Sequence, residues 1–189
     1  MPGAEIIGGT QAADAIQRAG ILARAQGIFA ETAPRWAMSA GSILLDGAVN
    51  YAAVALLAGD VITNLNTVVT TGGVALTLSK LGVYDKLGNR LALSADQGAA
   101  WQATGMMTAA MLAPYAVLTS DLYYFAVVSK GGVLPTMLRN AVSGVTAALS
   151  VIGSKPPPLS AQAGQTDLPA TGTIVAGSAT AFGVWIGAS

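Results

Sequence analysis

The side chains of this chain that could do chemistry are mainly its nine carboxylates, because the sequence contains neither histidine nor cysteine. Without histidine the chain lacks the commonest general base and the commonest ligand of transition metals. Without cysteine it can form neither a disulfide nor a reactive thiolate. The carboxylates are Glu5, Asp14, Glu31, Asp46, Asp60, Asp85, Asp96, Asp121 and Asp167.

The positions of these carboxylates do not indicate a catalytic site. Most lie next to glycine or at the edge of an apolar β segment, where aspartate caps turns. No local pair resembles the acid and nucleophile of a glycosidase, although such a pair could assemble in three dimensions. Residues 94–98 (SADQG) and 84–89 (YDKLGN) come closest to a metal site, but neither has the calcium-loop pattern. We therefore predict no catalytic residue, no metal and no cofactor, and hence no enzyme.

Other chemical motifs are also missing from the sequence. The chain has many glycines, yet it has no phosphate-binding loop of the GxxxxGK[ST] type and no GxGxxG that opens a helix. Its serines lack the GxSxG elbow of hydrolases and, without histidine, their usual base. Its basic residues are scattered, so nucleic acid is not expected as a partner.

The low charge content is the most informative feature of the composition. Only 10% of the residues are charged and 53% are hydrophobic, whereas about 25% charged residues is typical. Nine basic and nine acidic residues cancel, so no net charge draws the chain to nucleic acid or to an anionic membrane. A monomer with this composition would be poorly solvated. The composition therefore predicts a subunit of an assembly, with copies of itself as partners.

Residues 97–120 contain no charged side chain. An uncharged segment of this length could cross a bilayer. However, acidic residues flank the segment, and its interior contains glutamine, threonine, glycine and proline. Basic flanks on one side would be expected of a spanning helix. We therefore predict buried core and no membrane insertion. The pattern leaves open whether residues 97–115 form a helix or a strand.

The first 38 residues differ from the rest and predict an N-terminal helical arm with a connector. Thr10 suits a helix N-cap, residues 11–31 contain many helix formers, and Pro34 favours a helix end before it. The helix would be apolar on two sides, so it either lies between partners or packs on its own domain. The side chains predicted to anchor a partner are Ile16, Ile21, Leu22, Ile28 and Phe29.

Residues 39–189 predict one β domain built from short segments with glycine-rich turns. Residues 85–89 (DKLGN) predict a hairpin loop, because Gly88 and Asn89 suit positive φ. In the strand before it, alternation predicts Val74, Leu76 and Leu78 inward and Ser79 outward. Residues 121–130 are apolar on both parities, which is typical of a central strand or of one covered by a neighbouring subunit.

The end of the chain predicts a long loop followed by a final strand. Residues 154–170 include three consecutive prolines, which force extended backbone, and we expect this loop to wrap the domain. Residues 180–189 predict the last strand, with Phe182, Val184 and Ile186 on one face and Trp185 on the other. The predicted fold is mainly β: a jelly-roll-like antiparallel β-sandwich with an N-terminal helical arm.

From Ala37 onward the chain resembles virion structural proteins of tailed bacteriophages with jelly-roll-like domains. The resemblance lies in the order of the following pieces. Residues 56–77 (LLAGDVITNLNTVVTTGGVALT) resemble the start of these domains. Residues 80–101 (KLGVYDKLGNRLALSADQGAAW) resemble their hairpin and the segment after it. Residues 113–139 (APYAVLTSDLYYFAVVSKGGVLPTMLR) resemble their tyrosine-rich strand, and residues 168–189 (LPATGTIVAGSATAFGVWIGAS) their last strand.

This resemblance implies a non-enzymatic role on the surface of a phage particle, for a protein made in the host cytoplasm. The implied roles are capsid decoration, head fibre or tail-associated attachment, with a homotrimer as the implied oligomer. The N-terminal arm would bind a major capsid or tail protein while the β domain faces outward. A receptor-binding or glycan-binding module for host attachment is the alternative, and exposed aromatic rings beside Asp or Asn in one concave patch would favour it.

Overall fold

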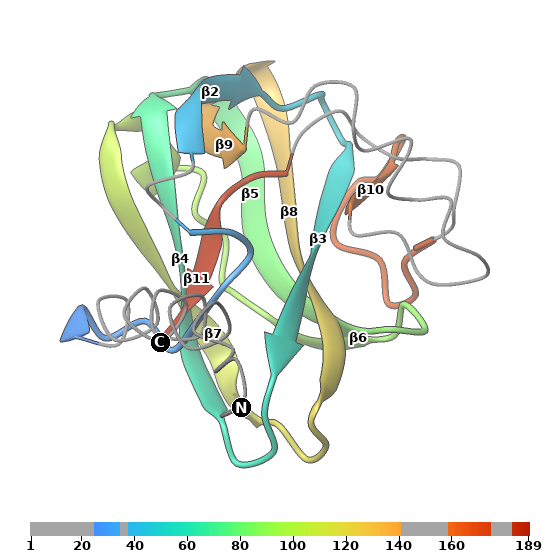
Figure 1. Cartoon of the computed structure of the whole chain (residues 1–189). Helices are drawn as coiled ribbons and strands as arrows, with labels where there is room; N and C mark the ends of the chain where they lie inside the picture. The colour runs from blue at the N-terminus through green and yellow to red at the C-terminus, as the bar shows by residue number, and fades with distance from the viewer. Residues whose placement is uncertain (1–24, 35–37, 141–158, 175–182) are drawn as a thin grey trace, which may run out of the picture.

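The computed structural model describes residues 25–34, 38–140, 159–174 and 183–189. These residues form two antiparallel sheets that pack face to face (Figure 1). The mainly β, antiparallel sandwich expected from the sequence is therefore confirmed. The predicted arm helix lies, up to residue 24, outside the described residues.

The first sheet is built around β4. β9 and β11 both pair with one side of β4, and β7 pairs with its other side. β2 adjoins β9, and β1 adjoins β11. The bounds of these strands are β1 (Ala30–Glu31), β2 (Met38–Ile43), β4 (Val61–Thr71), β7 (Gly105–Ala116), β9 (Thr136–Asn140) and β11 (Ile186–Ala188).

The second sheet has the order β10-β3-β8-β5-β6, with β8 in its centre. The bounds of its strands are β3 (Val49–Leu56), β5 (Val74–Asp85), β6 (Arg90–Leu93), β8 (Asp121–Val133) and β10 (Leu159–Gln162). A short 3-10 helix, η2 (Ala100–Gln102), precedes β7.

The strands from β2 to β9 pair like one long hairpin that is folded over on itself. β5 pairs with β6 at the closed end, followed outward by β4 with β7, β3 with β8 and β2 with β9. Two further pairings, β4 with β9 and β5 with β8, join these ladders into the two sheets. Because successive strands run in opposite directions, the β3–β4, β5–β6 and β7–β8 turns come to one end of the sandwich. We call this end the turn end.

Strand β8 shows how the chain fills both faces of the second sheet. Tyr123, Phe125 and Val127 lie in the main core between the sheets, and the alternate residues Tyr124, Ala126 and Val128 lie in a second cluster on the opposite face. Both sets are buried. The sequence prediction of a central strand for residues 121–130 is confirmed, since β3 and β5 flank β8.

The second cluster is covered by residues 163–174 of the same chain. Leu168 is buried against it, and Gly82 of β5 leaves room for this leucine, because a Cβ there would lie 2.8 Å from Leu168 Cδ1. The Tyr84 hydroxyl donates to Pro169 O at 2.8 Å, and Arg90 Nη1 donates to Leu168 O. Of the predicted wrapping loop, residues 163–170 lie against this cluster. Residues 159–162 instead form β10, and residues 154–158 lie outside the described residues.

Burial of the tyrosines beneath this segment has a consequence at alkaline pH. Desolvation raises the pKa of Tyr51 and that of Tyr124 to about 12, and the ring of Tyr51 meets that of Tyr84 edge to face with centroids 5.2 Å apart. Because folding favours the neutral form of these tyrosines, their stabilising contribution is complete at pH values below the unfolded pKa of about 10. This stabilisation is lost as the pH rises from about 10 to 12.

We therefore expect the free energy of unfolding to fall by about 1 kcal/mol per tyrosine and pH unit in this window. Urea unfolding at pH 9, 10, 11 and 12 would measure the fall, and absorbance at the tyrosinate band would report ionisation. The Tyr124→Phe variant is the control, and its stability should fall less. An equal fall in both proteins would contradict the assignment.

The structure corrects the expected end of the arm helix. The sequence pattern extended the helix to Glu31, but Gly27 has φ +77° and Ala30–Glu31 form β1 against β11. A left-handed glycine is a common helix terminator. The expected domain boundary at residue 38 also lies too late, because Phe29 N donates to Ala188 O and Thr32 N donates to Ile186 O. Residues 28–32 are thus part of the sandwich.

The predicted orientation of β5 is wrong at its start. Val74 is exposed and Ser79 is fully buried, where its hydroxyl lies 2.9 Å from that of Ser129. The pairing of β5 with β8 is irregular between Leu76 and Leu78. Such an irregularity changes which side chains of the strand face the core. Hydrogen bonding between the two hydroxyls also removes most of the cost of burying them.

The sequence left open whether residues 97–115 form a helix or a strand. Residues 100–102 form the short 3-10 helix η2, and the residues from Gly105 onward form strand β7, which pairs with β4. No helix in the described part of the chain is long and apolar enough to span a bilayer. The final strand is shorter than expected, and Val184 and Ile186 lie in the main core as predicted. The hairpin at 85–89 is confirmed by the pairing of β5 with β6, and Gly88 has φ +89°.

Candidate functional site

The carboxylates at the two segments closest to metal sites serve as turn acceptors. Asp85 accepts hydrogen bonds from Leu87 N at 2.9 Å and from both nitrogens of Asn89 at 2.8 Å. Asp96 Oδ1 accepts from Ser79 N at 2.7 Å and from Gly98 N at 3.0 Å. Each of these side chains therefore holds backbone in place.

The other described carboxylates are also engaged in structure. Each accepts a hydrogen bond from a backbone amide, an indole or an ammonium group. The pairs are Glu31 with Trp185 Nε1, Asp46 with Gly131 N, Asp60 with Leu57 N, Asp121 with Lys86 and Asp167 with Lys80. Among the residues that the structure describes, no three acidic, histidine or cysteine side chains are grouped to hold a metal ion. Glu5 and Asp14 lie outside those residues.

The turn end is one place where exposed apolar side chains gather. Ala58 N of the β3–β4 turn donates to Ser120 Oγ of the β7–β8 turn at 2.9 Å, and Lys86 of the β5–β6 turn pairs with Asp121 at 2.6 Å. The β3–β4 and β7–β8 turns lie together at the bottom of Figure 1. Three chain segments far apart in the sequence thus form one surface.

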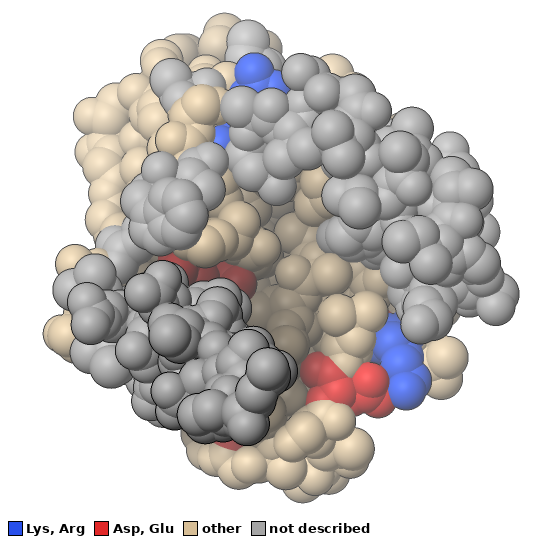
Figure 2. Space-filling model, in the orientation of Figure 1, with Lys and Arg blue, Asp and Glu red and all other residues tan. Residues whose placement is uncertain are grey.

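Each of the three turns exposes one leucine. Leu57 is 56% exposed, Leu87 75% and Leu118 84%. Single exposed apolar side chains are ordinary, but several on one surface indicate contact with another molecule. Charged side chains lie beside them, including the Lys86–Asp121 pair, and acidic and basic side chains group together at one place on the face shown in Figure 2. The turn end is therefore the candidate functional site.

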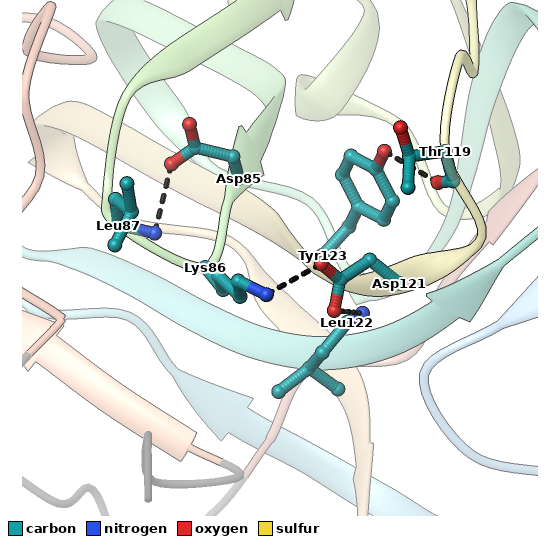
Figure 3. A pocket seen from close by; sticks show the side chains of 7 residues that line it. All are labelled: Asp85, Lys86, Leu87, Thr119, Asp121, Leu122 and Tyr123. Atoms are coloured by element: carbon teal, nitrogen blue, oxygen red, sulfur yellow. Dashed lines mark hydrogen bonds and ion pairs between the residues drawn. The ribbon is translucent and has the colours of Figure 1, made fainter.

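An open depression of about 220 Å³ lies between the β5–β6 and β7–β8 turns (Figure 3). Leu87, Leu122 and Tyr123 contribute apolar groups to its wall, and the Lys86–Asp121 ion pair lies beside them. Tyr123 is only 6% exposed, and its hydroxyl donates to Thr119 O at 2.8 Å. The wall is thus fixed by hydrogen bonds.

The ion pair at the depression is neutral overall and exposed. Hydrogen bonding and attraction to Asp121 raise the pKa of Lys86. Hydrogen bonds from Lys86 and from Leu122 N lower the pKa of Asp121. Both groups therefore remain charged through the neutral range. An exposed pair of this kind adds little to stability. Its main effect is that the charges of Lys86 and Asp121 cancel beside the depression.

Two of the predicted anchoring residues pack on this chain's own sandwich. Ile28 is 4% exposed and lies beside Gly187, and Phe29 is half-buried against the main core. For these two residues the structure favours packing on the same domain. Ile16, Ile21 and Leu22 lie outside the described residues, and their anchoring role stays a prediction.

A second hollow, of about 490 Å³, lies where the arm meets the sandwich. It is lined by Gln26, Gly27 and Ile28 together with β4 and β7 side chains such as Asn66 and Met106. Thr108 donates to Asn66 Oδ1 at 2.8 Å, so the polar groups beside it are already paired. This hollow belongs to the attachment of the arm.

The exposure of the turn-end leucines was not predicted from the sequence. Their signal was available, because each lies within three residues of a glycine or aspartate that marks a turn. The signal is not sufficient by itself, because Val117 of the β7–β8 turn is buried in the main core.

Comparison of the chain with models of known protein families found no match, and comparison with curated protein sequences found none either.

Proposed function

We propose that this protein is a non-enzymatic structural component of a tailed-phage particle, displayed on the capsid or tail as a homo-oligomer. In this proposal the β domain projects outward. Residues 1–24 bind a capsid or tail protein, with Ile16, Ile21 and Leu22 as the anchoring side chains, while Ile28 and Phe29 fix the arm to the domain.

The order of strand pairing supports the fold part of this proposal. The sheets β2-β9-β4-β7 and β3-β8-β5-β6, once the added strands β1, β10 and β11 are set aside, have the order of a jelly roll. Jelly rolls occur in viral capsid proteins and also in lectins. The fold alone does not fix the function, so it supports the proposal together with the sequence resemblance.

The observation that carries the proposal is the turn end, with exposed Leu57, Leu87 and Leu118 on a chain that is only 10% charged. Surfaces of this kind gain free energy when they are covered, at about 25 cal/mol per Å² of apolar area. The described carboxylates hold turns or ion pairs, which is what a structural protein needs of them.

The glycan-binding alternative has no specific support in the described part of the chain. Its aromatic rings are buried or half-buried: Phe29, Tyr51, Tyr84, Trp101, Tyr115, Tyr123, Tyr124, Phe125 and Trp185. A flat aromatic platform for a sugar needs an exposed ring face. Trp36 and Phe182 lie outside the described residues.

Density-gradient purification of the phage that encodes the chain would test the proposal. The protein should migrate with intact particles, and an antibody raised against the purified chain should label their surface in electron micrographs. Recovery of the chain only in the soluble fraction of the lysate, with unlabelled particles, would contradict a structural role.

A further inference from the structure

We propose that the turn end is the contact between copies of this chain, in which Leu118 of one copy enters the depression beside Leu87 of the next. This inference rests on the homo-oligomer of the proposed function and names the surface that forms it. It commits to a second copy as the occupant of the depression.

The turn end carries both parts of such a contact. Leu118 projects from the β7–β8 turn with 84% of its surface exposed. The depression begins at the next residue, because Thr119 forms part of its wall. Leu118 does not line the hollow of its own copy, so it is available to fill that of a neighbour. Projection and hollow on one surface make this surface complementary to itself.

The chemistry of the hollow matches an aliphatic side chain. Leu87 and Leu122 provide apolar wall, and the hydroxyl of Tyr123 is already paired with Thr119 O. Lys86 and Asp121 neutralise each other at 2.6 Å. A leucine that enters therefore leaves the Tyr123 hydroxyl and the Lys86–Asp121 pair with their partners, and loss of such partners would be costly.

The charges around the turn end are mainly acidic. Asp60 and Asp85 are partly exposed, and Lys86 is already paired with Asp121 of its own copy. The contact between copies therefore depends on its apolar side chains rather than on ion pairs. The same contact closes as a two-fold dimer when it is mutual, or as a ring such as a trimer when it runs from copy to copy.

A charged substitution in the projecting leucine tests this contact in the full chain. Sedimentation equilibrium of wild type, Leu118→Asp and Val133→Asp would be compared without detergent. Val133 is the matched control, because it is 58% exposed and lies at the opposite end of the sandwich. We expect Leu118→Asp to raise the dissociation constant at least tenfold and Val133→Asp to leave it unchanged. Far-ultraviolet circular dichroism would verify that both variants fold.

A second measurement uses the absence of cysteine from the chain. Leu118→Cys and Leu87→Cys variants, mixed and oxidised, should form a disulfide between copies. Val133→Cys mixed with Leu87→Cys should not.

Each result decides between the inference and an alternative. Loss of association in Leu118→Asp, together with the selective disulfide, supports the inference. An oligomer that persists in Leu118→Asp and forms no selective disulfide overturns this contact but leaves the proposed homo-oligomer standing. A wild-type chain that is monomeric at 100 µM overturns both the contact and the homo-oligomer.

Discussion

Replacing Trp185 with alanine is expected to lower the free energy of unfolding by about 3–5 kcal/mol. Trp185 is fully buried just before β11, and its Nε1 donates to Glu31 Oε2 of β1 at 2.9 Å. The indole thus joins residues at the two ends of the described chain. Its removal would leave a cavity and an unpaired carboxylate, and both destabilise the folded state. Denaturant unfolding followed by circular dichroism would measure the loss.

The Glu31→Ala variant separates packing from hydrogen bonding. It leaves the indole in place but removes its hydrogen bond to Glu31, so we expect a smaller loss of about 1–3 kcal/mol. If Trp185→Ala costs less than about 1 kcal/mol, the indole is not buried against β1 and β11 in solution. The inclusion of residues 28–32 in the sandwich would then be wrong.

The second large effect is expected for Leu168→Ala, with a loss of about 2–5 kcal/mol. Leu168 is 1% exposed and covers the tyrosine-lined face of the second sheet. Its neighbours hold the segment in place: Asp167 pairs with Lys80 at 2.7 Å. Truncation would therefore leave a hollow that the rest of the segment cannot fill. Urea unfolding, compared with wild type, would measure the loss.

Leu112→Ala is the matched control for Leu168→Ala, because it makes the same change at a leucine that is 67% exposed and lies outside the proposed contact between copies. Its effect should stay within about 0.5 kcal/mol, as is usual at a surface. Equal, small effects of both substitutions would mean that residues 163–174 do not cover this face of the sheet. A neighbouring subunit would then become the better explanation of its apolar character.

The local features of the fold could be predicted from the sequence because they depend on nearby residues. The loop at 85–89 carries its own turn residues. The apolar character of residues 121–130 on both parities predicted a central strand or one covered by a neighbouring subunit, and β8 is central. Distant pairings carry no such signal. Nothing near Ala30 indicates that it pairs with Ala188, so an extended segment was predicted as helix.

The site was harder to predict than the fold for a related reason. Leucine in a sequence is first assigned to the core, and only the location of Leu57, Leu87 and Leu118 in three adjacent turns shows that they are exposed. The low charge content already predicted that some surface is covered in an assembly. Which surface this is depends on the nesting of the hairpins, which brings the turns to one end.

The most direct test of the central claim, that this chain is an assembly subunit, is its mass in solution. Light scattering of the full chain without detergent, over a range of concentrations, should give a multiple of 18.8 kDa, and a threefold mass would match the expected trimer. A mass of one chain at every concentration, in a protein that stays soluble, would contradict the claim. The exposed leucines would then need another explanation.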